Sequence, residues 1–152
     1  SKELTVAPDT LKKNLALYLN QFRLISDAID ILDAQIINLR VEYTIVTDPG
    51  FNRNLVLQNV TSKLRDFFAQ KVFDIDEPVM ISDIRNLVYN NQGVLSVQDV
   101  RVRNVTGTVG TRTYSDVQFD VTSNTTRGIV VGPHGSMFEI KYRDFDLVGT
   151  SL

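Results

Sequence analysis

The sequence predicts an α+β fold, in which a small mixed sheet carries two or three covering helices and is followed by a β-rich C-terminal tail. Three observations predict it. Apolar and polar residues alternate from Ile37 to Ile45, as in a strand with one buried face. Apolar residues recur every three to four positions over 54–70, as in a helix packed on a sheet. After Asn104 no helical period is visible, and six of the eight glycines lie there.

The N-terminal half is expected to contain two helices and one long strand. A Pro8-Asp9-Thr10 start signal predicts a helix over 10–25. The strand is predicted over 29–46, and a Pro-Gly turn ends it. The second helix is predicted over 54–70. Its apolar stripe is expected to face the sheet and contains Leu57, Val60, Leu64 and Phe67, widened by Val56 and Phe68.

The middle of the chain is expected to continue with an extended segment, a short helix and a strand. A proline bars a helix through 73–81. Ser82 is expected to cap a helix over 82–89, and Gly93 suits the left-handed position that follows a helix. A second strand is predicted over 94–105, with alternate valines facing the core.

The tail is predicted to contain short strands. Apolar and polar residues alternate over 117–121 and 138–142, and 128–131 is a short β-branched run. We therefore divide the chain into a helix-and-sheet unit, 1–105, and a β-rich tail, 106–152, packed on the first unit.

Composition excludes several classes of protein. The 152 residues are enough for one domain with its own core. The 16 basic and 18 acidic residues show no basic excess of the kind that nucleic-acid binders carry. There is no cysteine and one histidine, so disulfides, thiolate zinc sites and two-histidine metal sites are excluded within one chain. No apolar run approaches the ~20 residues that cross a bilayer. We expect no cofactor, no nucleic-acid partner and no membrane insertion.

The polar motifs have ordinary structural interpretations. His134 lies in a Gly-Pro-His-Gly-Ser turn that lacks the nucleophile-elbow pattern, so it is interpreted as a solvated turn residue. Asp27, Asp30 and Asp33 would share one face and could bind a cation in a helix, but in the extended segment predicted there Asp30 opposes the other two. The segment 74–77 lacks the glycine and the terminal glutamate of a calcium loop, so both sets are interpreted as solvated or capping carboxylates. No catalytic residue and no metal ligand is predicted, and the chain is not expected to be an enzyme. A carboxylate-based hydrolase remains an alternative that requires two acids to converge in a pocket.

The order of elements in the middle of the chain resembles a known family. It runs from Ile29-Asp30-Ile31-Leu32-Asp33-Ala34 through the alternating strand 37–45 to Asp48-Pro49-Gly50, and it continues with the apolar stripe of 56–68, Ile81-Ser82-Asp83-Ile84 and the Gly93-Val94 strand start. This order is similar to the C-terminal part of the baseplate J-like proteins of contractile phage tails and related injection machines. Within that family it is most similar to the large inner-wedge members of T4-like phages. The resemblance covers residues 11–103.

The resemblance implies a structural role. Members are wedge components of the plate at the tail tip, and they rearrange when the sheath contracts. They associate with copies of themselves and with other wedge proteins. We therefore expect a C-terminal piece of a longer wedge component that is located in the virion tail baseplate and assembled in the host cytoplasm. The alternative is a carbohydrate- or peptide-binding module that uses the Thr/Asn/Gly-rich tail loops, in which Tyr114 is the available aromatic residue.

Aromatic residues are the candidates for a subunit interface. Two neighbouring rings on one helix cannot both point into the same core, and three more aromatic residues gather near the C-terminus. The candidate interface residues are Phe67, Phe68, Phe138, Tyr142 and Phe145. The alternative is that all five are core residues.

Overall fold

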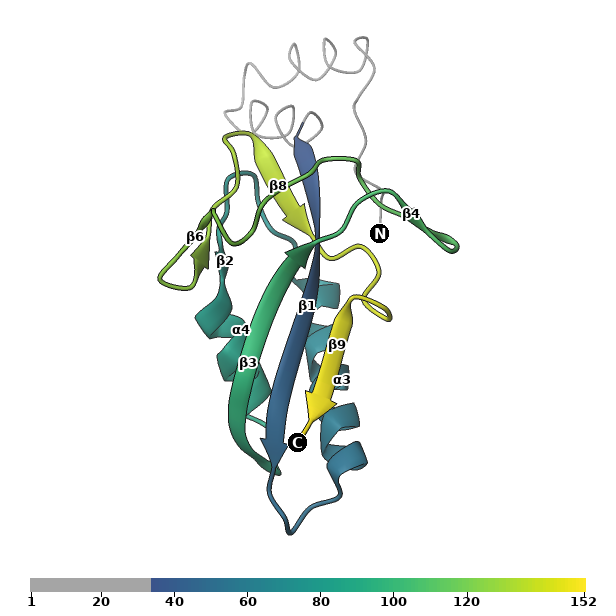
Figure 1. Ribbon diagram of the computed structural model, residues 1–152, viewed down its shortest axis with the longest axis vertical. Helices are drawn as coiled ribbons and strands as arrows, with labels where there is room; N and C mark the ends of the chain where they lie inside the picture. The colour runs from purple at the N-terminus through teal and green to yellow at the C-terminus, as the bar shows by residue number, and fades with distance from the viewer. Residues whose placement is uncertain (1–33) are drawn as a thin grey trace, which may run out of the picture.

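The computed structural model describes residues 34–152 (Figure 1). The helix predicted over 10–25, the start of the strand predicted over 29–46, and Asp27, Asp30 and Asp33 lie outside the described residues. In the described part, helices and short mixed sheets form the α+β fold that the sequence predicts.

The main sheet is built around one long central strand, β1 (Gln35–Thr47). β3 (Val94–Asn104) pairs with it antiparallel, from Leu39 opposite Asn104 to Thr47 opposite Val94. Two later strands pair with β1 in parallel: β8 (Ser136–Glu139) along its first residues and β9 (Leu147–Ser151) along its later ones. The alternation that the sequence shows over 37–45 is therefore confirmed as a strand in the middle of a mixed sheet.

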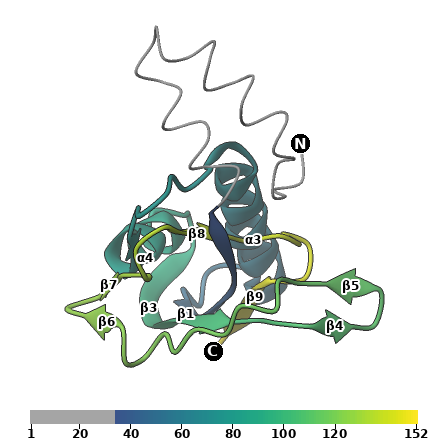
Figure 2. The same cartoon turned by 90° about the horizontal axis from the view of Figure 1, so that it is seen from above.

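The two faces of β1 differ in burial, because alternate residues point to opposite sides of the sheet. The odd-numbered positions from Ile37 to Thr47 are buried, and the even-numbered positions from Arg40 to Val46 are half-exposed on the other face. Two helices, α3 (Arg53–Gln70) and α4 (Ile81–Tyr89), cover the buried face and lie on the same side of the sheet (Figure 2). The other face carries no helix within residues 34–152.

α3 confirms the helix predicted over 54–70, but its buried stripe is turned relative to the prediction. The buried residues are Val56, Val60, Leu64 and Phe68, which follow a strict four-residue step. Leu57 and Phe67, which the sequence places in the centre of the stripe, are half-buried at its edge. The helix begins one residue early because the Asn52 side chain accepts a hydrogen bond from the Leu55 amide at 3.1 Å.

α4 confirms the short helix predicted over 82–89, but the predicted N-cap, Ser82, is wrong. The residue at the N-cap is Met80, which makes no side-chain hydrogen bond there, and Ser82 lies within the helix. The preceding strand β2 (Val79–Met80) pairs with β7 (Ile129–Val130) and leads directly into the helix. The sheet therefore fixes where the helix begins. Gly93 does have a left-handed backbone, with φ of 91°, but it lies in the turn before β3, past the C-cap Asn90.

The tail contains smaller strands and contributes two strands to the main sheet. β4 (Thr108–Val109) and β5 (Arg112–Thr113) form a hairpin, and β6 (Thr125–Thr126) and β7 (Ile129–Val130) join β2 in a three-stranded sheet. Because β8 and β9 pair with β1, residues on both sides of the proposed 105/106 boundary build one sheet.

The strand predicted over 117–121 is wrong, because that segment has no ladder partner. Its apolar side chains are half-buried against the core, and the Phe119 amide donates to Asn104 Oδ1 at 2.9 Å. Alternate side chains of this irregular segment face the core, so its sequence alternates between apolar and polar residues as a strand's does. The strand predicted over 138–142 likewise ends at Glu139.

Candidate interaction surfaces

The five candidate interface aromatics lie at different depths. Phe68 and Phe138 are buried in the core, and Phe67 is half-buried with its ring edge-to-face on Phe68 at a centroid distance of 5.0 Å. Tyr142 is half-buried. Phe145 is exposed over 55% of its surface. Of the five, Phe145 alone offers most of its ring to a partner.

Arg112 connects the exposed Phe145 ring to a buried carboxylate. Its guanidinium lies 4.6 Å from the centroid of the Phe145 ring, and one guanidinium nitrogen lies 3.8 Å from Asp146 Oδ1. Asp146 is fully buried, and its other carboxylate oxygen accepts a hydrogen bond from the Tyr114 hydroxyl at 2.7 Å. These contacts hold the β4–β5 hairpin and the residues after it against the segment that leads into β9.

The environment of Tyr114 stabilises its neutral hydroxyl. Burial raises the pKa of Tyr114 to about 12, and the hydrogen bond to Asp146 and the charge of Asp146 act in the same direction. The Tyr114 ring is also buried, edge-to-face against Tyr142 at 5.2 Å. The aromatic side chain that the carbohydrate-binding alternative would use is therefore not presented to a ligand.

The face of the sheet opposite the helices is charged. Glu42 on β1 accepts a hydrogen bond from Arg103 Nε at 2.6 Å and lies 3.5 Å from Arg40. Asp99 pairs with Arg101 on the same strand at 2.7 Å. An open depression of about 300 Å³ lies over these residues. Both carboxylates lining it are ion-paired with arginines, so the face presents alternating charges.

The segments that meet at one end of the molecule carry exposed apolar residues. Here β1 ends, α3 and β3 begin, and the chain reaches residue 152 (Figure 1). Hydrogen bonds join these segments, since the Asp48 amide donates to Gly93 O at 2.9 Å and the Leu152 amide to Ile45 O at 2.8 Å. We call this the apolar end, and its exposed residues are Phe51, Leu55, Leu95 and Leu152.

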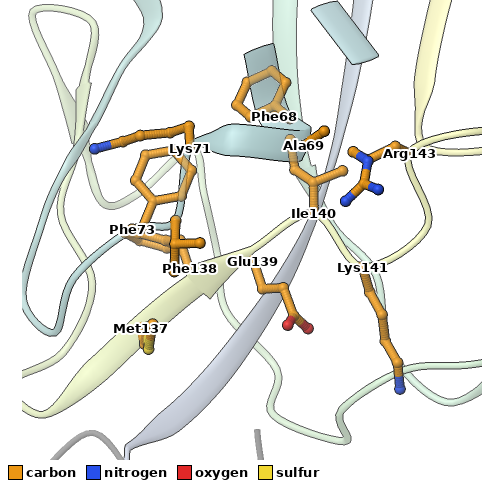
Figure 3. Close-up of a pocket in the computed structure, with 11 residues that line it drawn as sticks. Phe68, Ala69, Lys71, Phe73, Met137, Phe138, Glu139, Ile140, Lys141 and Arg143 are labelled. Carbon is orange, nitrogen blue, oxygen red and sulfur yellow. The ribbon is translucent and has the colours of Figure 1, made fainter. Parts of the chain in front are cut away.

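A small cavity lies between the end of α3 and β8 (Figure 3). Its volume is about 150 Å³, below the roughly 300 Å³ at which drug-sized ligand sites begin. Its wall is aromatic and aliphatic, with Phe68, Phe73, Phe138 and Ile140, and its rim carries the cationic side chains of Lys71, Lys141 and Arg143. The cavity is large enough for one amino-acid side chain.

The residues with catalytic potential in the sequence do not come together. The His134 side chain is 98% exposed, and its Nδ1 lies 3.3 Å from Asp76. The Ser136 hydroxyl donates to Pro133 O at 2.6 Å, away from that imidazole. No group of three or more His, Asp or Glu side chains within residues 34–152 is arranged to hold a metal ion. Neither helix of that range combines the length and apolar character needed to cross a bilayer.

The carboxylates of 74–77 serve a local turn. Glu77 accepts hydrogen bonds from Lys71 Nζ at 2.5 Å and from the Asp74 amide at 2.9 Å. Partial desolvation alone would raise the pKa of Glu77, but these two hydrogen bonds lower it below its ordinary value. Asp76 has a left-handed backbone and accepts a hydrogen bond from the Gly135 amide at 2.7 Å. These carboxylates therefore fix the loop beside the cavity.

The chain matches no family model, no curated protein and no solved structure.

Neither the apolar end nor the cavity is predicted by the sequence. Their residues are scattered along the chain, and they meet only because the ends of β1 and β3 coincide and β8 lies beside the end of α3. The sequence does indicate that Leu55 is exposed, because Leu55 lies outside the apolar stripe of its helix.

Proposed function

We propose that this chain is a structural component of a contractile phage-tail baseplate wedge, in which it associates with copies of itself and with other wedge proteins. The order of elements that the sequence predicts over residues 11–103 motivates the proposal. Within residues 34–103 the strand β1, the helices α3 and α4 and the strand β3 follow one another in that order. Such a component would be located in the virion tail baseplate and assembled in the host cytoplasm. Its mechanism is contact between proteins.

The observation that carries this proposal is the apolar end. Four large apolar side chains are exposed on the segments that meet at this end, namely Phe51, Leu55, Leu95 and Leu152. Several large apolar residues exposed on adjoining segments are the feature of the described residues that best supports contact with another protein. Phe145 with its stacked Arg112 provides a second, smaller contact of the kind enriched at protein interfaces.

Self-association of the purified chain tests the first part of the proposal. We expect sedimentation velocity to show dimers or larger species at micromolar concentration. The Leu55→Glu/Leu95→Glu variant should shift this equilibrium to monomer, because it places two charges in the apolar end. Its melting temperature should stay near that of the parent chain, since both side chains are exposed.

A matched variant separates the apolar end from general surface hydrophobicity. Val109→Glu/Val131→Glu makes the same chemical change at two exposed positions elsewhere. It should associate as the parent chain does. Equal loss of association in both double variants, or a parent chain that is monomeric at every concentration, would contradict self-association through the apolar end.

Location tests the second part. Antibodies raised against the purified chain should label the distal tip of contractile tails in electron micrographs of particles from a lysate that contains the encoding virus. Labelling of capsids, or of tails along the sheath, would contradict a baseplate role.

A further inference from the structure

The cavity at the end of α3 has an apolar wall and a cationic rim. It combines an apolar wall, made by Phe68, Phe73 and Phe138, with an exposed apolar residue, Val72, at its mouth. Three of its wall aromatics belong to the core, so its shape is fixed by the packing of α3 against β8. An opening of about 150 Å³ suits one leucine-sized side chain.

The charges around the cavity are asymmetric. Lys71 on one side is ion-paired with Glu77 at 2.5 Å. On the other side Lys141 donates to the neutral carbonyl of Thr113 at 2.8 Å, and Arg143 is exposed and makes no ion pair or hydrogen bond within residues 34–152. Figure 3 shows Arg143 and Lys141 extending from the same side of the cavity. That side therefore carries two positive charges.

Glu139 in the lining offsets one of these two positive charges, so the side with Lys141 and Arg143 keeps a net positive charge. Glu139 accepts a hydrogen bond from the Asn38 amide nitrogen at 2.9 Å, which ties its carboxylate to β1. Arg143 and Lys141 remain the charged groups that an incoming chain would meet beside the apolar wall.

From this arrangement we infer that the cavity is the anchor site for an acidic segment of a partner protein, which inserts one leucine-sized apolar side chain and places a neighbouring carboxylate against Arg143 and Lys141. Interface anchors of this kind supply much of the binding energy, because a fully buried apolar side chain is surrounded by contacts that exclude water. The cations add orientation and attraction at a distance. The inference deepens the proposed function, on which it rests, by stating the chemistry of one partner.

The test uses three capped pentapeptides as probes. The first has a central leucine with two acidic residues on each side, the second replaces the leucine by serine, and the third replaces the acids by lysines. Titration into the purified chain is followed by NMR at the methyl groups of Ile140 and Met137, which line the cavity. We expect shifts at both methyls with the first peptide, little change with the other two, and weaker binding at higher salt.

Two surface variants locate the binding. Ala69 is exposed at the rim, so Ala69→Trp should cover the mouth and abolish the shifts without disturbing the core. Arg143→Glu should raise the dissociation constant about five-fold, the size of one exposed charge contact converted to repulsion. Arg53→Glu is the matched control, because it makes the same change at the other end of α3, roughly 25 Å away along the helix.

Every outcome bears on the inference. It is overturned if the acidic leucine peptide causes no shifts at millimolar concentration, if the serine or lysine peptide binds equally well, or if Arg53→Glu weakens binding as much as Arg143→Glu. None of these results depends on self-association or on antibody labelling of tails. A failed anchor site and a failed baseplate role can therefore be told apart.

Discussion

Asp146 is fully buried, and a buried carboxylate is costly unless its charge and lone pairs find partners. The Tyr114 hydroxyl supplies a hydrogen bond, and Arg112 supplies opposite charge at 3.8 Å. The second carboxylate oxygen, Oδ1, has no hydrogen-bond partner within residues 34–152. Within residues 34–152 the Tyr114 hydroxyl is therefore the hydrogen-bond donor to the Asp146 carboxylate. Removing that hydroxyl should lower the stability of the fold.

Tyr114→Phe is expected to lower the free energy of unfolding by about 1–3 kcal/mol, because it leaves a buried carboxylate without its hydrogen-bond donor. Urea denaturation at pH 8 measures the change. Tyr89→Phe removes the same hydroxyl from an exposed ring and should change the midpoint little. An unchanged midpoint for Tyr114→Phe would contradict the role given to this hydrogen bond.

The same residue should give the protein a dependence on alkaline pH. The folded-state pKa of Tyr114 is raised to about 12, above the ordinary value of 10.0, so folding favours the protonated hydroxyl. This stabilisation is fully present below pH 10 and is lost as pH rises from 10 through 12. Urea denaturation should therefore show a larger loss over this range for the parent chain than for Tyr114→Phe, in which the buried Tyr43, whose pKa is also raised, still contributes. Parallel pH profiles for the two proteins would contradict the raised pKa.

At the scale of elements, the two helices begin in different ways. α3 begins after an irregular turn, and the Asn52 side chain caps it. α4 begins directly at the end of β2, where Met80 makes no side-chain cap, and its position is set by the pairing of β2 with β7. One helix start is encoded locally, and the other depends on a strand some fifty residues later in the chain.

This difference predicts unequal effects of two similar substitutions. Asn52→Ala should lower the free energy of unfolding by about 1 kcal/mol, because it removes the hydrogen bond to the Leu55 amide. Ser82→Ala should change it by less than about 0.5 kcal/mol, since Ser82 is exposed and caps nothing. Thermal denaturation of the two variants side by side measures this. A larger effect at Ser82 would show that the sequence-based cap assignment is correct after all.

The elements that could be predicted from the sequence are those with a sustained period. α3, α4 and β3 lie within one residue of their predicted bounds, and β1 ends within one residue of its predicted end, because each repeats its pattern over several turns or pleats. β1 begins at Gln35, later than the predicted start at residue 29. β9 was not predicted, because Leu147-Val148-Gly149-Thr150-Ser151 is short and contains a glycine. That glycine is required by packing, since a Cβ at Gly149 would collide with the ring of Tyr43 on the neighbouring strand.

The candidate surfaces were harder to predict than the fold. The sequence offered five aromatic residues as interface candidates, with the alternative that all five are core residues, and of these Phe145 is the one that is mostly exposed. Exposure of an aromatic ring depends on tertiary contacts, and no period in the sequence reports them. Lys71 and Lys141 line opposite sides of one cavity because β8 pairs with β1, a long-range contact that the local pattern does not contain.

At the scale of the whole molecule, the last strand completes the core. Leu147 is buried opposite Val41, in a parallel ladder between the ends of the described chain. The C-terminal residues thus contribute to the same apolar core as β1 and α3. They are part of the main fold and not only of its surface.

Leu147→Ala should accordingly lower the free energy of unfolding by about 2–5 kcal/mol, the usual effect of emptying a buried leucine site. Leu152→Ala truncates a nearby exposed leucine and should have little effect on stability. Chemical denaturation of both variants provides the comparison. If Leu147→Ala were as stable as Leu152→Ala, β9 would be an appendage of the sheet.

The parallel pairing of β1 with β9 also has a consequence for biosynthesis. The ribosome releases β1 and α3 long before Leu147–Ser151, so during translation the edge of β1 that β9 will occupy stays unpaired. An unpaired strand edge can join another chain, and neighbouring nascent chains on one messenger RNA lie close together. Closure of the sheet on the last strand therefore competes with chaperone binding and with premature contact between nascent copies.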